Sequence, residues 1–200
     1  SLAIEIAREA SSRGVYSLDI PVSGGDIGAR NATLTMMVGG EQEALESVRP
    51  LLSCMGKSIN YMGPPGSGQH TKMANQIIIC TNMIGVCEGL LYAYKAGLDV
   101  ERVLQAVSGG AAASFSLNSY GPRILKRDMN PGFYCEHFVK DLQIALDESR
   151  KLGLVLPGLN TAKMMYEMLI QHGGSKLGTQ ALIQVLETMN NMIMPKIIQE

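Results

Sequence analysis

The sequence predicts an α/β segment followed by an all-helical segment. Strand and helix patterns alternate over residues 1–65, which is typical of a sheet layer covered by helices. Beyond residue 65 no convincing strand pattern occurs, and the nearly continuous apolar stretch over residues 68–96 predicts one long helix. We therefore expect a sheet unit over residues 1–66 and a helical unit over residues 67–200 that is built on this helix.

Five elements are expected in the sheet unit. The helices cover residues 2–12 and 41–55, and Pro50 is expected to break or kink the second because proline lacks an amide donor. The strands are short and each ends at glycine or proline. They cover residues 15–20, 34–38 and 58–62.

Six helices are expected in the helical unit. The long one should end at Gly97, since glycine suits the left-handed position after a helix. Asp99 is expected to cap the next helix, which runs to about Val107. The others are expected near residues 114–127, 136–152, 158–172 and 178–193.

Composition limits the class of protein. With 46% hydrophobic and 18% charged residues the chain has the composition of a globular protein, and its net charge of −1 argues against general nucleic-acid binding. No uninterrupted apolar run of about 18 residues occurs, so a membrane span is not expected. The four cysteines lack C-x-x-C spacing, and three lie in apolar runs, which predicts buried free thiols in a reducing compartment, the cytoplasm or the mitochondrial matrix. A targeting signal cannot be judged, because the sequence starts at Ser1 within a helical pattern.

The stretch Gly66–Asn75 carries the first candidate site. Its glycine-rich start leads into the long helix, where Lys72 and Asn75 are three residues apart and so share one face. The first turn of this helix would also offer unpaired backbone N–H groups and the positive end of the helix dipole. Together these groups could polarise an oxygen of a small anionic substrate. His70 points elsewhere on a helix, so a general-base role is the less favoured interpretation.

The loop of residues 19–25 carries the second candidate site. It offers the hydroxyl of Ser23 and the uncovered backbone of Gly24 and Gly25, which suit a substrate carboxylate. The alternative is a turn that merely ends a strand, since serine and glycine are common in turns.

Three motifs, in this order and at these separations, resemble the β-hydroxyacid dehydrogenases, the family of 3-hydroxyisobutyrate dehydrogenase and tartronate semialdehyde reductase. The motifs are residues 19–25, residues 66–75 and Lys140-Asp-Leu142, and the resemblance runs from about Leu2 to Asn190. It implies that residues 1–66 are the C-terminal part of a Rossmann-type dinucleotide-binding domain. Residues 67–200 would then be the all-helical domain that supplies the catalytic lysine and the dimer contact.

The resemblance also implies an activity. The protein would be an NAD- or NADP-dependent oxidoreductase that interconverts a short-chain β-hydroxy acid and its semialdehyde, as a homo-oligomer (dimer or tetramer) without a metal. It assigns catalysis to Lys72, substrate binding to Ser23, Gly24, Gly25 and Asn75, and cofactor binding near the nicotinamide to Lys140.

The sequence departs from the family pattern at two places. Gln76 stands where family members often carry a second asparagine, and its role is open. The Gly-x-Gly-x-x-Gly turn that receives a pyrophosphate does not occur, because the pairs at 24–25 and 109–110 lack both the spacing and the strand–turn–helix setting. We interpret the chain as a fragment or truncated form without the N-terminal βαβ unit.

Simpler interpretations exist for single residues. A helical lysine is usually a solvated surface charge, and Lys140 beside Asp141 could lie on a solvated face. His137 and His172 are expected to be structural, and the 13 methionines to fill the core. For the whole chain, the alternative to an enzyme is a non-catalytic oligomerisation scaffold derived from this fold.

Overall fold

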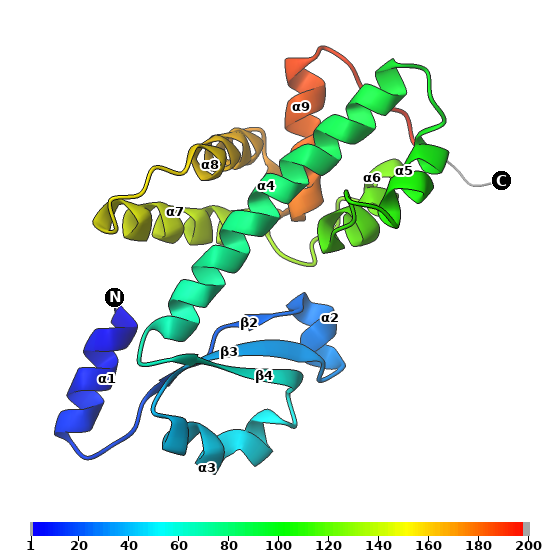
Figure 1. The fold of residues 1–200 in the computed structure, drawn as a ribbon. Coiled ribbons are helices and arrows are strands. Elements are labelled where there is room, and N and C mark those ends of the chain that lie inside the picture. The colour runs from blue at the N-terminus through cyan, green and yellow to red at the C-terminus, as the bar shows by residue number, and fades with distance from the viewer. Residues whose placement is uncertain (1, 198–200) are drawn as a thin grey trace. The chain divides into compact units, whose positions relative to one another are not determined.

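A computed structural model describes residues 2–197, which fall into two compact units (Figure 1). The first unit ends at Asn75 and the second begins at Gln76, so the division falls inside helix α4 (Ser67–Lys95). The sequence pattern instead divides the chain at Gly66, ahead of this helix. Each unit is described by itself below.

The first unit is a four-stranded mixed sheet with β3 (Leu34–Gly40) as its most buried strand. On one side β3 pairs in parallel with β4 (Gly56–Gly63), and α3 (Gln42–Leu52) provides the crossover that parallel strands need. On its other side β3 pairs antiparallel with β1 (Leu18–Asp19) and β2 (Val22–Ser23). The core of this unit consists of Met36, Val38, Leu45 and Leu52, and the partly buried Ile20 and Ile59 pack against it.

Three features of the first unit differ from the sequence prediction. The strand expected at residues 15–20 is only two residues long, and β2 follows it after Pro21, which has no N–H to donate to a ladder. Helix α3 continues through Pro50 to Leu52, so no break occurs at that proline. A short helix, α2 (Gly25–Arg30), follows β2, where the sequence analysis expected neither a helix nor a strand.

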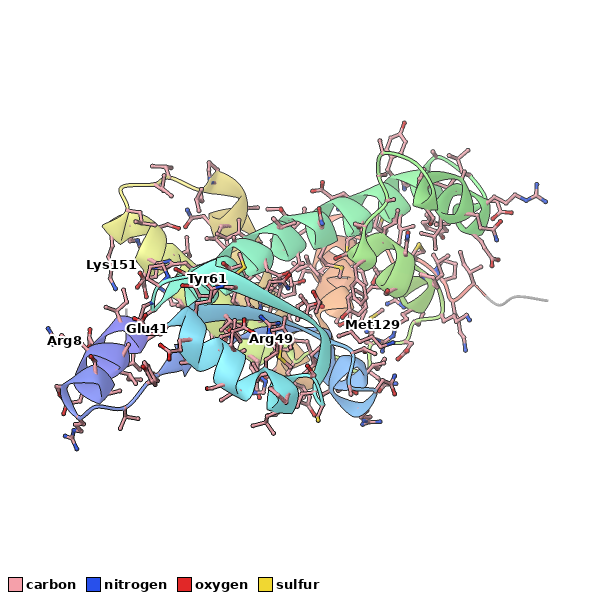
Figure 2. All side chains as sticks on the ribbon, turned by 60° about the horizontal axis from the view of Figure 1, so that its bottom comes forward. Arg8, Glu41, Arg49, Tyr61, Met129 and Lys151 are labelled. Carbon is pink, nitrogen blue, oxygen red and sulfur yellow. The ribbon has the colours of Figure 1, made fainter. Side chains whose placement is uncertain are left out.

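The outer helices of the first unit present both polar and apolar side chains to solvent. Arg49 of α3, which is labelled in Figure 2, donates two hydrogen bonds to Glu46, each 2.7 Å long. Helix α1 (Leu2–Ser12) buries no residue, and Leu2, Ile4 and Ile6 are exposed.

The second unit contains only helical elements among its described residues. The expected end and cap after α4 are confirmed: Gly97 has φ 75°, and the Asp99 carboxylate accepts a hydrogen bond from the amide of Arg102. The two helices expected near 114–127 and 178–193 each consist of two pieces of different winding. The elements are α5 (Val100–Ser108), the π-helical η1 (Ser116–Tyr120), α6 (Gly121–Leu125), α7 (Cys135–Lys151), α8 (Pro157–Gln171), the 3₁₀-helical η2 (Gly174–Lys176) and η3 (Thr179–Leu182), and α9 (Ile183–Met189).

The core of the second unit is centred on α7 and α8. The rings of Phe138 and Tyr166 meet edge to face with centroids 5.0 Å apart, and both residues are almost fully buried. The Tyr166 hydroxyl donates to the carbonyl of Thr179 at 2.9 Å, so its polar end is satisfied inside the core.

Helix α4 is long and apolar enough, by length and composition alone, to cross a membrane. Its most apolar 18-residue window has a mean hydropathy of 1.5 and is 39% buried. The search of the sequence for uninterrupted apolar runs did not find this helix. Thr81, Asn82 and Glu88 interrupt its apolar residues but lower the mean hydropathy of the window only slightly. Cys80, Met83, Cys87 and Leu90 of this helix are buried within the protein, which is the pattern of a core helix.

Candidate active site

The amine of Lys72 lies against the loop that carries Ser23. Its Nζ donates to the main-chain carbonyl of Val22 at 2.9 Å, and Val22 directly precedes Ser23 in β2. Lys72 is in the second turn of α4 and is partly buried. Two segments 50 residues apart in the sequence therefore meet at the carbonyl that directly precedes Ser23.

The backbone around Gly24 and Gly25 has a conformation that other residues rarely adopt. Their φ angles are 132° and 62°. A Cβ on Gly24 would also lie 3.2 Å from the side chain of Leu34. These two residues turn the chain from β2 into α2, and the first N–H groups of a helix have no partner inside that helix. The glycines thus expose backbone donors directly after Ser23, as a carboxylate-binding loop requires.

Three amides at the start of α4, which the sequence suggested would be free, have partners within the protein. The carboxylate of Asp19 accepts hydrogen bonds from the amides of Gly66 and Gln69, both at 2.8 Å, and the amide of Ser67 donates to Pro64. Asp19 therefore caps the helix from β1, which also places a negative charge at the positive end of the dipole. The idea that this helix end polarises a substrate oxygen is corrected accordingly.

Asp19 is a residue whose role the sequence analysis missed. The signal was present, since α4 has no acidic residue of its own in the first turn, whereas α3 and α5 do. Gly68 shows how close the two segments are: a Cβ there would lie 2.4 Å from the carbonyl oxygen of Met37 and 2.5 Å from that of Asp19. The helix that carries Lys72 is therefore fixed to the sheet by backbone contact.

Asn75 follows Lys72 by one helical turn and is partly buried, at the end of the first unit. His70 is exposed.

Lys140, on α7 of the second unit, forms an ion pair with its neighbour Asp141. Nζ lies 2.9 Å from Oδ1, while the Lys140 side chain is 66% exposed. The other carboxylate oxygen of Asp141 accepts a hydrogen bond from the Gln76 amide at 2.7 Å, and Gln76 is 1% exposed. The structure thus gives Gln76, whose role the sequence left open, a buried partner beside Lys140.

The family resemblance assigns Lys140 to the part of NAD(P) near the nicotinamide, and a lysine ammonium can donate to carboxamide or phosphate oxygens such as those of a dinucleotide. Nothing in residues 2–197 provides the glycine-rich turn for the pyrophosphate. Within the same residues, no group of three or more His, Cys, Asp or Glu side chains is arranged to hold a metal ion.

The thiols are poorly suited to nucleophilic chemistry. Burial raises the pKa of Cys80 to about 11 and that of Cys135 to about 12, and it raises the pKa of Cys87 further. Cys54 is exposed, and all four are free, as the sequence predicts. At neutral pH the three buried thiols stay protonated, so they act as core residues.

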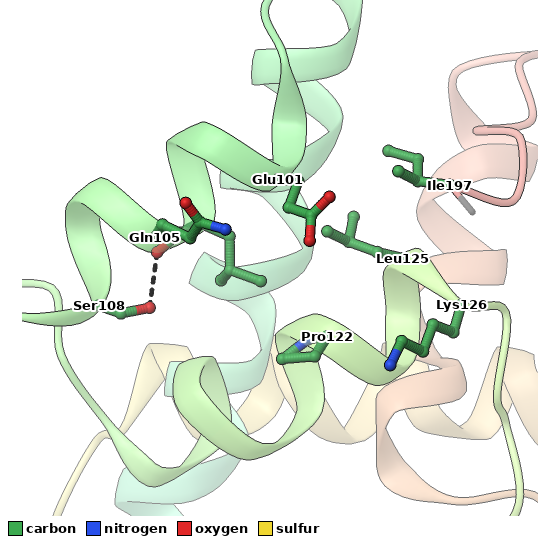
Figure 3. A pocket seen from close by; sticks show the side chains of 8 residues that line it. Glu101, Gln105, Ser108, Pro122, Leu125, Lys126 and Ile197 are labelled. Atoms are coloured by element: carbon green, nitrogen blue, oxygen red, sulfur yellow. Dashed lines mark hydrogen bonds between the residues drawn. The ribbon is translucent and has the colours of Figure 1, made fainter. Parts of the chain in front are cut away.

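A cavity of about 410 Å³ in the second unit contains none of the predicted site residues (Figure 3). It lies between α5 and α6, with Ile197 at one side and Glu101 and Lys126 on opposite walls. Its lining is largely apolar and includes Leu104, Pro122 and Leu125, which is typical of imperfect packing between short helices.

Comparison with known proteins assigns the family. Residues 66–186 match the family model described as NAD-binding of NADP-dependent 3-hydroxyisobutyrate dehydrogenase. The chain belongs to the β-hydroxyacid dehydrogenase family. Residues 1–63 match the NAD binding domain of 6-phosphogluconate dehydrogenase, and both descriptions agree with the NAD or NADP expected from the sequence.

Relatives support this membership along most of the chain. The "probable 3-hydroxyisobutyrate dehydrogenase-like 1, mitochondrial" of Arabidopsis thaliana is 54% identical over 96% of the chain and 57% of its own length. The 2-hydroxy-3-oxopropionate reductase of Escherichia coli is 46% identical over 92% of the chain and 63% of its own length. The solved Mycobacterium tuberculosis 3-hydroxyisobutyrate dehydrogenase with L-serine shares the fold with a TM-score of 0.85 and 30% identity, over 92% of the chain and 65% of that protein.

The chain thus spans somewhat less than two thirds of the length of these β-hydroxyacid dehydrogenase relatives. The predicted combination of a Rossmann-type sheet portion and a helical domain is confirmed. These relatives are named as dehydrogenases or reductases, so the scaffold alternative finds no support.

Proposed function

We propose that this chain is the substrate-side part of an NAD(P)-dependent oxidoreductase that interconverts a short β-hydroxy acid and its semialdehyde. The observation that carries the proposal is the Lys72 amine, 2.9 Å from the Val22 carbonyl at the start of the Ser23–Gly25 loop. The dinucleotide-binding βαβ unit would come from sequence ahead of Ser1. The exposed Leu2, Ile4 and Ile6 of α1 offer an apolar surface for such a unit to cover.

In this proposal the loop holds the substrate and Lys72 moves the proton. The Ser23 hydroxyl and the amides of Gly24 and Gly25 bind the carboxylate and so fix the hydroxyl-bearing carbon. In the direction of oxidation, Lys72 as the neutral amine accepts the hydroxyl proton while the carbon–hydrogen bond breaks and the C=O bond forms. In reduction, the Lys72 ammonium returns a proton to that oxygen. NAD(P), when bound, would accept or supply the hydride, which is the hydrogen of the carbon–hydrogen bond together with both bonding electrons.

Asn75 would hydrogen-bond the same substrate from one turn further along α4. Lys140 would contact the cofactor near its nicotinamide end. Both assignments rest on the family motifs, and the exposed side chain of Lys140 leaves it accessible to a ligand.

The substrate class follows from the relatives' names, which include 3-hydroxyisobutyrate and 2-hydroxy-3-oxopropionate. The residues after the loop, 26–30, favour these two over longer semialdehydes. A reducing compartment, the cytoplasm or the mitochondrial matrix, agrees with the buried thiols and with the word mitochondrial in the Arabidopsis name.

We also propose a homo-oligomer that uses the outer face of α4. Ile78 and Tyr92 are 58% and 75% exposed, and the ideal Cβ positions of Gly85 and Gly89 meet no atom within 4 Å. Such a row of small residues between apolar side chains lets a second helix approach closely. Gly85→Arg is expected to give a smaller particle by light scattering, and an unchanged mass would reject this surface.

The experiment that tests the function is a turnover assay of the full-length protein with NAD⁺ and NADP⁺. Its substrates are 3-hydroxyisobutyrate, D-glycerate (the reduced form of tartronate semialdehyde), glycolate and 4-hydroxybutyrate. We expect turnover of at least one of the first two with one cofactor. Absence of turnover with every pair, in a protein whose melting temperature rises with cofactor, would contradict the proposed reaction.

A further inference from the structure

Asp141 is a buried carboxylate with two partners of different kinds. It is 8% exposed, its Oδ2 accepts from the Gln76 amide at 2.7 Å, and its Oδ1 pairs with Lys140 Nζ at 2.9 Å. Gln76 is on α4 and Asp141 on α7, so the contact joins helices 65 residues apart in the sequence. Both helices belong, at these residues, to the same compact unit.

The ion pair between Lys140 and Asp141 is not one that helix geometry produces by default. Successive residues on a helix point about 100° apart, so pairs three or four positions apart normally meet. Here the Lys140 stem must turn back toward its neighbour while its head remains largely exposed. A salt bridge on an open helix surface restrains little, but the carboxylate of this pair is itself immobilised by a buried amide.

Packing alone gives no reason for a charged group at position 141. Its neighbours on the same side of α7 are Phe138, Leu142 and Ala145, all 1% exposed or less, and an apolar side chain would suit that environment. Removing a carboxylate from water costs free energy, which hydrogen bonds only partly return. The buried carboxylate therefore costs folding free energy, and its best explanation is that it holds the Lys140 ammonium.

We propose that Gln76 and Asp141 are positioning residues that fix the direction of the Lys140 ammonium toward a bound anionic or carboxamide group. This inference rests on the proposed function, in which that group belongs to NAD(P). Gln76 fixes the carboxylate, and the carboxylate fixes the amine. A buried contact of α4 thereby determines where an exposed cation of α7 points.

The first test measures the order of the Lys140 side chain by NMR of the 200-residue chain. Lysine labelled with ¹³C and ¹⁵N reports the mobility of Cε, and Lys95, exposed at the end of α4, is the internal reference. We expect Lys140 to be more ordered than Lys95 in the wild type. In the paired variant Gln76→Met/Asp141→Val, which replaces both buried polar groups with apolar ones, Lys140 should become as mobile as Lys95.

Two results would overturn the inference. One is a Lys140 as mobile as Lys95 in the wild type, and the other is an unchanged Lys140 in the folded paired variant. If that variant does not fold, the same NMR measurement is made on Asp141→Asn, which keeps an oxygen that can accept from Gln76 but loses the negative charge. Lys140 must then gain mobility while the amide spectrum of α7 stays native.

The second test separates this inference from the proposed function. In the full-length protein, Lys140→Met should raise the KM for the cofactor about tenfold or more, the size of one lost charge-assisted hydrogen bond, with a smaller change in kcat. The paired variant should have the same effect, and adding Lys140→Met to it should change nothing further. A normal KM for the cofactor in Lys140→Met would show that Lys140 does not bind the cofactor, and it would leave the NMR result unaffected. If the KM effects of Lys140→Met and of the paired variant were additive, the positioning role would be rejected.

Discussion

The two units of the chain hold their lysines by different means. In the first unit, Lys72 is placed by the main chain, because its amine donates to the Val22 carbonyl. Its helix is fixed to the sheet at Gly68, which has no room for a Cβ. The loop beside Lys72 contains Gly24 and Gly25, both with positive φ. In the second unit, Lys140 is held by buried side chains, Asp141 and Gln76. Backbone placement fixes a group tightly but requires particular glycines, whereas side-chain placement requires costly buried polar groups.

The largest expected effect concerns Lys72 itself. Lys72→Ala in the full-length protein should lower kcat by about a hundredfold or more, because general acid–base catalysis contributes at least that much. Lys57→Ala, an exposed lysine on β4, is the matched control and should leave kcat unchanged. Near-normal turnover of Lys72→Ala by steady-state kinetics would show that the amine beside Val22 does no chemistry.

The role of backbone contact is tested by a pair of glycine substitutions. Gly68→Ala should destabilise the protein by about 1–3 kcal/mol or more, since its Cβ would meet two carbonyl oxygens at 2.4 and 2.5 Å. Gly109→Ala is the control, because no atom lies within 4 Å of its ideal Cβ and its φ is −101°. Urea unfolding measures both, and equal stabilities for the two variants would refute the close approach of α4 to the sheet.

A further prediction distinguishes the two units by the pH dependence of their stability. The pKa of Cys80 is raised from 9.0 to about 11 and that of Cys135 to about 12, so both stay protonated in the folded state while unfolded thiols ionise from about pH 9. The unfolded state therefore binds fewer protons in this range, and stability should fall as pH rises from 9 to 11, by up to about 1.4 kcal/mol per unit for each thiol.

All three buried thiols lie in the second unit, so its unfolding should carry this dependence. Urea unfolding of Cys135→Ala at pH 8 to 11 should show a shallower decline than the wild type. Identical slopes for the two proteins would contradict the protected state of that thiol.

Local sequence signals predicted much of the fold. Gly97 and Asp99 marked the end of α4 and the start of α5, and the alternation of strands and helices indicated the sheet layer in which β3 pairs with β4. The predicted break at Pro50 was wrong, because α3 continues to Leu52. The proline lies in the last turn of this helix, so its missing N–H removes a hydrogen bond only close to the helix end. Strand length was overestimated where Pro21 interrupts the ladder.

The candidate site was predicted from motifs, and its supporting residues were not. Lys72 and the Ser23 loop carry recognisable patterns, but Asp19 and Gln76 act through contacts with residues 47 to 65 positions away. Such contacts have no local period, so only the folded chain shows that Asp19 occupies the helix end that the sequence offered to a substrate.

The most direct test of the account is whether a hydroxy acid binds at the loop beside Lys72. With ¹⁵N-labelled full-length protein saturated with cofactor, titration of 3-hydroxyisobutyrate or D-glycerate should move the amide signals of Ser23, Gly24 and Gly25 most. Signals that respond only outside residues 22–25 and 72–75, with saturable binding, would contradict the proposal that this loop and Lys72 form the substrate site.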